Sequence, residues 1–342
     1  MLKGRQNAAQ IIILFFLGLM VLLAWHSGLS NTRLLNDSLV RLFMNGILVL
    51  SLLPMLKVGA GINYGLPVGI QAGLLGMCAA VNYRLTGISG LFAALLFACI
   101  GGVLFGYAYA RILNLLKGKE EIAGIFIGFA FVFIMSFFWA VAPFSNAGML
   151  WPIGGKGLRP TIGLDNYFSK VLNKLWVLNL GDIILPVGMG LFFALLCLLL
   201  YAFYKTKIGI ASTAVGENEN FARLSGIDVE RIRILAIILS TVLAAVGICI
   251  YAQSYGFVEL YDAPLMMAFP AASAILIGGS MGAGTSIIQV IIGTFLFQSV
   301  YVYTGPIANT LLLPEVSEIV RVIIVNGIIL YALLYEGRRE KA

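Results

Sequence analysis

The sequence predicts an all-α polytopic membrane protein with about ten transmembrane helices. Apolar residues make up 61% and charged residues only 11% of the 342 residues, whereas soluble domains carry roughly 45–50% apolar and about 25% charged residues. The mean hydropathy is +0.99. The charged residues are concentrated in short intervals between long apolar runs, and about 20 apolar residues cross a bilayer as a helix.

Ten apolar segments are long enough to span the membrane, and they make residues 1–342 a single transmembrane domain. By residue number, the predicted spans are 8–25, 38–57, 66–83, 88–111, 121–143, 182–204, 233–255, 264–281, 285–303 and 317–335. The third, eighth and ninth are rich in glycine, so we expect them to be broken or re-entrant where protein shields their backbone from lipid. The first resembles a signal peptide, but Trp25-His26-Ser27 is a poor cleavage site, so we expect it to be retained.

The positive charges predict the orientation of the chain. With the N-terminus in the cytoplasm, ten spans return the C-terminus there, and 14 of the 22 Lys and Arg residues lie on the inner side. Cytoplasmic loops carry an excess of such residues. The sequence therefore predicts a multi-pass protein of the cytoplasmic membrane with both termini inside. The same asymmetry explains the net charge of +7, so nucleic acid is not an expected partner.

The outer loop, residues 144–181, contains an amphipathic pattern. Asp165 is the expected N-cap of a helix whose polar face carries Lys170, Asn173 and Lys174. The apolar face comprises Leu164, Phe168, Val171, Leu172, Leu175 and Trp176. Such a helix can lie in the outer headgroup layer, or it can form a gate or a docking surface for a soluble partner.

The inner loop, residues 205–232, is the most polar cytoplasmic segment. We expect a helix of about two turns from Glu217, ended by Gly226 in the C′ position. Asp228 then caps a second helix that runs into the seventh span. An isolated helix of two turns is only marginally stable, so the sequence predicts a soluble partner that holds it.

Motifs for catalysis or for cofactor binding are not found. The strings around Lys119 and Lys156 lack the glycine and hydroxyl residues of a P-loop, and HExxH and GxSxG motifs are missing. The single histidine, His26, has no neighbouring ligand, and the cysteines stand apart within apolar runs: Cys78, Cys99, Cys197 and Cys249. We therefore predict no metal, no cofactor and no enzymatic activity. Ionisable residues within the spans, which mark ion-coupled carriers, are nearly missing.

The stretch from Gly59 to Pro67 predicts a solute path. It is rich in helix breakers, and an interrupted helix frees backbone groups that commonly line such a path. Asn63, Tyr64 and Gln71 lie in or next to it. Uncharged amides suit a neutral polyhydroxylated or heterocyclic solute. The alternative for each amide is an interhelical hydrogen bond, worth about 0.6 kcal/mol on average.

Two segments carry a family resemblance. Ala214-Val215-Gly216-Glu217-Asn218 with Ala222-Arg223-Leu224-Ser225-Gly226-Ile227 resembles the cytoplasmic coupling loop of ABC importer permeases for sugars, nucleosides and branched-chain amino acids. Ile277-Gly278-Gly279-Ser280-Met281-Gly282-Ala283-Gly284 is similar to their Gly-Gly-rich segment. The resemblance covers roughly residues 40–335. It implies a fold like that of the cobalamin importer (type II), with the coupling loop between the sixth and seventh of ten spans.

The resemblance further implies the partners and the function. The permease would pair with an identical or paralogous permease, with two ATPase subunits and with an extracytoplasmic solute-binding protein. The expected ATPase contacts are Gly216, Glu217, Asn218, Phe221, Ala222, Arg223 and Gly226. Gly61-Ile62-Asn63-Tyr64-Gly65 is similar to the nucleoside and simple-sugar branch. A small hydrophilic solute, a sugar or a nucleoside, is therefore expected. The alternatives are a branched-chain amino acid permease and an ion-coupled secondary carrier.

Overall fold

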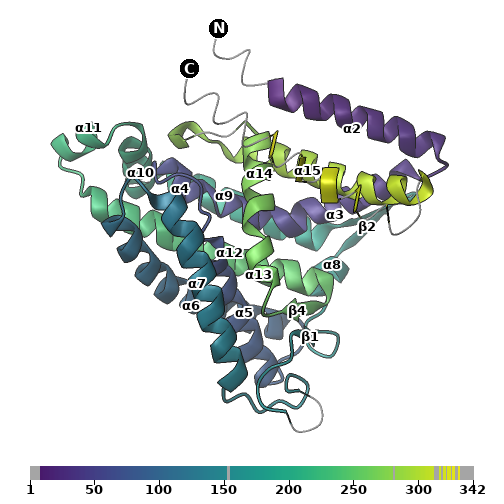
Figure 1. Cartoon of the computed structure of the whole chain (residues 1–342), viewed down its shortest axis with the longest axis horizontal. Coiled ribbons are helices and arrows are strands. Elements are labelled where there is room, and N and C mark those ends of the chain that lie inside the picture. The colour runs from purple at the N-terminus through teal and green to yellow at the C-terminus, as the bar shows by residue number, and fades with distance from the viewer. Residues whose placement is uncertain are drawn as a thin grey trace.

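The computed structural model is mostly helical and describes residues 8–151, 155–279 and 282–311, together with some positions between 316 and 331. Figure 1 shows α5, α6 and α7 running side by side toward the end of the molecule where β1 lies, while α11 lies at the opposite end. The long helices are α2 (Ala8–His26), α3 (Asn31–Leu50), α5 (Leu66–Asn82), α6 (Gly87–Leu115), α7 (Glu120–Val141), α9 (Val187–Lys205), α12 (Val229–Tyr255) and α15 (Ile287–Leu311).

The first nine predicted spans each coincide with a helix or a pair of helices. Among the described residues, α6, α7, α9, α12 and α15 are long and apolar enough to cross a membrane, and the residues of α2, α5 and α13–α14 form shorter apolar helices. About half of the predicted tenth span, 317–335, lies outside the described residues, and its described positions, all between 319 and 331, are helical. The chain is thus an all-α polytopic membrane protein.

The breaks within spans differ in part from the expectation. The eighth span is broken as predicted, into α13 (Ala263–Met266) and α14 (Ala268–Ile277). The third and ninth are continuous, as α5 and α15. The second span is broken instead, because α3 ends at Leu50 and α4 (Leu53–Lys57) follows. Gly69, Gly73 and Gly76 lie inside α5 without interrupting it, whereas Gly59, Gly61 and Gly65 lie in the connection before the helix.

The centre of the fold is the packing of α5 against α6 and α12. Glycines permit this packing: a Cβ on Gly69 would lie 2.6 Å from the carbonyl oxygen of Thr241, and one on Gly73 would lie 2.4 Å from that of Ala245. Small residues allow close approach of helices in lipid, where apolar burial alone provides little driving force between them. The side chains of α5 are consequently almost all buried.

The outer loop does not form the predicted amphipathic helix. Only α8 (Val171–Lys174) is helical. β1 (Thr161–Gly163) pairs antiparallel with β4 (Phe257–Glu259), and β2 (Val177–Leu180) forms a hairpin with β3 (Ile183–Pro186). Asp165 caps no helix, since the residues around it form turns.

Contacts with α12 explain this difference. The backbone N–H of Lys170 donates to the carbonyl oxygen of Gln253 at 2.6 Å, and Lys170 adopts a left-handed φ of 56° that interrupts a helix. Leu164 and Phe168 are fully buried in the core. Tertiary packing therefore overrides the helical period of this segment.

Candidate functional site

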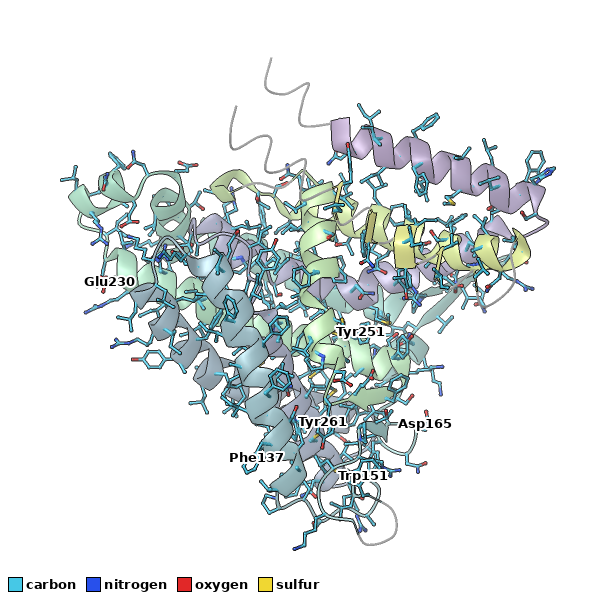
Figure 2. The ribbon with its side chains drawn as sticks, in the orientation of Figure 1. Phe137, Trp151, Asp165, Glu230, Tyr251 and Tyr261 are labelled. Atoms are coloured by element: carbon cyan, nitrogen blue, oxygen red, sulfur yellow. The ribbon has the colours of Figure 1, made fainter. Side chains whose placement is uncertain are left out.

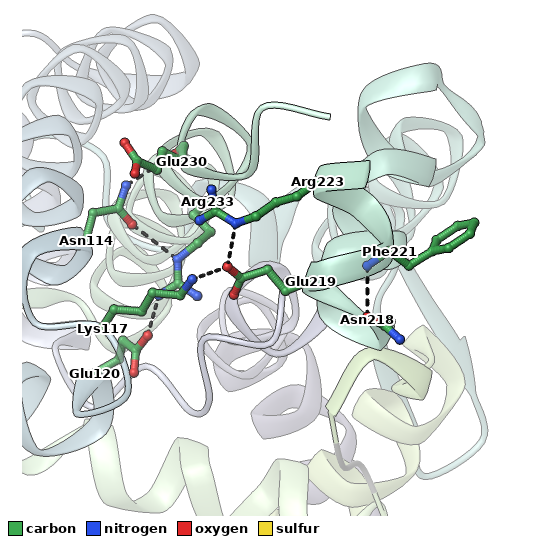
Figure 3. Close-up of polar contacts among 9 residues, drawn as sticks. All are labelled: Asn114, Lys117, Glu120, Asn218, Glu219, Phe221, Arg223, Glu230 and Arg233. Atoms are coloured by element: carbon green, nitrogen blue, oxygen red, sulfur yellow. Dashed lines mark hydrogen bonds and ion pairs between the residues drawn. The ribbon is translucent and has the colours of Figure 1, made fainter. Parts of the chain in front are cut away.

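The inner segment, residues 205–232, contains two short helices, α10 (Lys207–Glu217) and α11 (Glu219–Leu224). The side-chain oxygen of Asn218 accepts a hydrogen bond from the backbone N–H of Phe221 at 3.0 Å and so caps α11 (Figure 3). Gly226 has φ +81°, and Asp228 caps α12 through the N–H of Arg231 at 3.1 Å. The predicted stop and cap are confirmed. α11 begins two residues later than predicted, because Asn218 is extended, and α10 was not predicted.

Ion pairs hold α11 against the end of α6. Glu219 accepts hydrogen bonds from Lys117 and, at 3.0 Å, from Nε of Arg223 (Figure 3). The hydrogen bond from Lys117 is the largest of the effects that lower the pKa of Glu219 below its usual value. Ala222 is fully buried beneath the helix. The chain itself therefore supplies part of the support that such a short helix requires.

A second, buried ion pair lies close by. Arg233 of α12 pairs with Glu120 of α7, and only 4% and 10% of the two side chains are exposed. Nε of Arg233 also donates to Oδ1 of Asn114 at 3.2 Å, and Nδ2 of Asn114 donates to the carbonyl oxygen of Glu230 at 3.2 Å (Figure 3). This network joins the inner ends of α6, α7 and α12, so it fixes the base on which α11 rests.

The outward face of α11 is apolar at its centre. Phe221 is 63% exposed and Leu224 is 89% exposed. Sequence reasoning missed Leu224, although its spacing of three from Phe221 on a helix was a usable signal. The other predicted contact residues that are exposed are Glu217, Asn218, Arg223 and Gly226.

Gly216 and Ala222 face the protein instead. A Cβ on Gly216 would lie 2.2 Å from the carbonyl oxygen of Lys57 and 3.0 Å from the N–H nitrogen of Gly59. Only glycine permits this approach of α10 to the connection between α4 and α5. The two residues are therefore positioned to hold the inner segment on the spans, and their side of the segment is not available to a partner.

Asn63 lies at the other end of the same connection. It is 2% exposed, its Nδ2 donates to Oγ of Ser240 at 2.8 Å, and its Oδ1 accepts from the hydroxyl of Tyr109 at 3.0 Å. Oγ of Ser240 donates in turn to the carbonyl oxygen of Ser51 at 2.6 Å. The amide of Asn63 therefore joins α6 and α12 through both of its polar atoms, and its side chain is buried away from the cavities described below.

The other two predicted path residues, Tyr64 and Gln71, do not line the central cavity, which is described in the next paragraph. Gln71 is fully buried on α5, and its amide has no hydrogen-bond partner among the described residues. Its neighbours Ile70 and Leu74 line the cavity, whereas Gln71 does not. The ring of Tyr64 packs against Phe269 of α14, with 5.7 Å between the centroids.

The central cavity has a volume of about 470 Å³ and lies between α3, α5, α12, β4, α13, α14 and α15. Its aromatic lining includes Tyr251 and Tyr255, whose rings stack at 5.4 Å between centroids; Figure 2 marks Tyr251. Its polar lining comprises Arg41, Asn45, Glu259, Asp262 and Gln298. Aromatic faces with a few convergent polar groups are the usual composition of a site for a small organic molecule.

A second cavity of about 570 Å³ reaches the outer loop, where Lys170 and Asn173 line it. Arg41, Tyr255 and Tyr301 line both cavities. The guanidinium of Arg41 lies 4.8 Å from the centroid of the Tyr301 ring, a cation–π contact. These three side chains therefore stand where the two cavities meet. No sequence motif links them, because they come from three helices far apart in the chain.

The part of the chain that the structure describes contains no group of three or more His, Cys, Asp or Glu residues that could hold a metal ion.

Comparisons with known proteins give the family. Residues 8–333 match the family described as branched-chain amino acid transport system / permease component. The autoinducer 2 import system permease protein LsrC of Enterobacter sp. (strain 638) is 28% identical over 298 residues, covering 86% of this chain and 77% of that protein. The protein described as "Probable ABC transporter permease protein YphD" of Escherichia coli (strain K12) is 30% identical over 58% of this chain and 59% of its own length.

A solved ABC transporter in an inward-facing conformation covers 93% of this chain and 98% of its own, at 16% identity and a TM-score of 0.44. A score this low indicates only a distant similarity. The family match extends over nearly the whole chain, however, and it includes the inner segment and the central cavity. The chain therefore belongs to the branched-chain amino acid transport system / permease component family and is a transport permease of the ABC importer type.

Proposed function

We propose that the chain is the membrane-spanning subunit of an ATP-driven importer and that a small hydrophilic solute, a sugar or a nucleoside, crosses through the central cavity. The stacked Tyr251 and Tyr255 carry this proposal, because ring faces suit the apolar faces of a sugar or a heterocycle. Asn45 and Gln298 add uncharged hydrogen-bonding groups to the same lining. The import system named for the similar LsrC protein agrees with a small organic solute.

The inner segment is the proposed contact with a separate ATPase, which would hydrolyse the ATP. Phe221 and Leu224 would form the apolar centre of the interface with the ATPase. Around them would lie Glu217, Asn218, Arg223 and Gly226. Gly216 and Ala222 would support the segment from within. A second permease and an extracytoplasmic solute-binding protein would complete the importer in the cytoplasmic membrane, with both termini in the cytoplasm. Asn63, Tyr64 and Gln71 are proposed to support the path from behind its lining.

Reconstitution tests this proposal. The permease and its ATPase are placed in vesicles with the solute-binding protein, and uptake is measured for the solute that stabilises the binding protein against heat. We expect uptake to require ATP and Tyr251→Ala to reduce it at least tenfold. Phe137→Ala, which changes an exposed aromatic residue of α7 away from the cavity, should leave uptake unchanged. Uptake driven by an ion gradient without ATP would identify an ion-coupled carrier instead.

One observation favours a second candidate, a branched-chain amino acid. Arg41 on one side of the cavity and the carboxylates of Glu259 and Asp262 on another could hold the two charges of a zwitterion. The description of the matching family names this substrate class. Arg41→Gln separates the candidates: it should abolish amino-acid uptake, whereas sugar uptake should persist.

A further inference from the structure

An apolar groove lies on the outside of the bundle, between α6 and α9 and against α8. Its volume is about 240 Å³. Leu91 and Leu95 form its floor and are 2% and 8% exposed. Phe92 of α6 and Leu195 of α9 form its rim and are 63% and 51% exposed. Apart from the indole of Trp176, no lining side chain carries a polar group.

The two helices that form the walls of the groove, α6 and α9, indicate the environment on its open side. α6 and α9 are both long and apolar enough to span a membrane, and only 33% and 22% of their most apolar windows are buried inside the protein. Their remaining surface is exposed and apolar, as is typical of the lipid-facing side of a spanning helix. The open side of the groove therefore faces acyl chains, and its lining offers a polar ligand nothing to bind.

α8 separates this groove from the second cavity. Val171, Leu172 and Leu175 line the groove, whereas Lys170 and Asn173 line the cavity. The helix is fixed to the outer end of α12. The N–H of Leu172 donates to Oε1 of Gln253 at 3.3 Å, and Nδ2 of Asn173 donates to Oγ of Ser254 at 2.9 Å.

α8 is also joined to the start of α9, so the groove keeps its shape. The N–H of Gly188 donates to the carbonyl oxygen of Leu175 at 3.0 Å, and the N–H of Val187 donates to that of Trp176 at 3.0 Å. A Cβ on Gly188 would lie 2.6 Å from the oxygen of Leu175. The groove is consequently preformed, which lowers the cost of binding.

We propose that this groove binds one acyl chain of a phospholipid and that the bound chain supports α8 as the wall of the second cavity. Exposed Lys174 and Trp176 beside the groove are residue types that mark the headgroup level. A helix of a second copy is the alternative occupant, and the measurements below distinguish the two.

Native mass spectrometry of the detergent-purified protein tests the proposal. Leu195→Trp fills the groove, and Leu199→Trp is the matched control, since Leu199 is similarly exposed on the same helix but does not line the groove. We expect the unmodified chain and Leu199→Trp to retain one phospholipid per permease and Leu195→Trp to lose it. Equal retention in the two variants, or no retained phospholipid in the unmodified chain, would overturn the proposal.

A second variant keeps the proposal testable if Leu195→Trp does not fold. Ile88→Trp obstructs the groove from the opposite wall, since Ile88 of α6 also lines it, and this variant should lose the same phospholipid. Titration of dioleoyl phosphatidylglycerol into the delipidated chain should raise its melting temperature by several degrees, and this rise should be missing in both filled variants. If the filled variants dissociate a dimer and keep their phospholipid, the groove is an interface between copies and the acyl-chain assignment is wrong.

Discussion

Phe221 shows what a single exposed side chain contributes to the proposed ATPase contact. Aromatic anchors at the centre of an interface commonly cost 2 kcal/mol or more on truncation. We expect Phe221→Ala to weaken binding of the purified ATPase by about 30-fold, which corresponds to roughly 2 kcal/mol. Isothermal titration calorimetry in detergent measures the dissociation constant.

The control for this variant is Trp151→Ala, which removes an exposed aromatic residue from the outer loop (Figure 2). It should leave ATPase binding unchanged. Wild-type affinity in Phe221→Ala would mean that the ATPase binds elsewhere.

Asn63 carries a different prediction, because both of its polar atoms are used inside the protein. Asn63→Leu leaves the hydroxyl of Tyr109 without its acceptor and Oγ of Ser240 without its donor. Each buried group left unsatisfied costs about 1–3 kcal/mol. We expect the melting temperature in detergent to fall by several degrees, and uptake to fall with it.

The matched variant is Asn179→Leu, which changes an exposed asparagine of the β2–β3 hairpin and should not alter the melting temperature. An unchanged melting temperature with reduced uptake in Asn63→Leu would restore Asn63 as a residue of the solute path.

Single residues were predicted from the sequence where the signal was local. Asp228 and Gly226 act through their immediate neighbours, so cap chemistry was sufficient to place them. The cavity residues Arg41, Tyr251 and Gln298 come from three helices, and only the packing of those helices brings them together. For Asn63, the sequence could not separate a residue of the solute path from a buried hydrogen-bonding residue.

At the scale of elements, α11 depends on the charge of Glu219. The lowered pKa of Glu219, caused mainly by the hydrogen bond from Lys117, means that the pair stabilises α11 above the usual carboxyl pKa. This stabilisation is lost as the pH falls through the lowered pKa, where Glu219 becomes protonated. We therefore expect α11 to loosen in acid, at a pH below 4.5.

An environment-sensitive fluorophore on Asn220→Cys reports this loosening across an acid titration. Glu219→Gln should show the loosened signal already at pH 7 and little further change. An identical acid transition in Glu219→Gln would assign the transition to another group.

Elements were predicted well where one physical rule dominated. The lipid-facing helices follow from the lengths of their apolar runs, and α12 begins at its predicted cap. The amphipathic helix predicted for the outer loop does not form, because the apolar residues of this loop pack onto the outer end of α12. Leu164 is held by its N–H bond to the carbonyl oxygen of Gly256 at 2.8 Å, a partner about 90 residues away that no local pattern reveals.

For the whole molecule, the orientation in the membrane remains a prediction from charge. We expect Asn179→Cys to react with an impermeant maleimide in intact cells and Asn220→Cys to react only after lysis, because the two residues lie at opposite ends of the spans. Both positions are exposed. The parent chain controls for background, since Cys78, Cys197 and Cys249 are buried and Cys99 is half-buried. The reverse pattern of labelling would invert the topology.

The helical, multi-span architecture followed from composition alone, because lipid leaves a spanning chain few alternatives. How the helices pack did not follow. The close contacts of α5 with α6 and α12 rest on individual glycines, and the sequence offered several pairs of small residues without indicating which would meet. The arrangement of the cobalamin importer stays an expectation from the resemblance.

The pairing of β1 with β4 has a consequence for biosynthesis. Thr161 pairs with Glu259, so the two partners are separated by nearly a hundred residues and by α9 and α12. After β1 has been synthesised, α9 and α12 must both be synthesised and inserted before β4 can reach β1. Until then the outer loop has an unpaired strand edge, which other chains can capture. The closing of this small sheet is therefore a late event in assembly, and it marks the point at which α12 has been fully inserted.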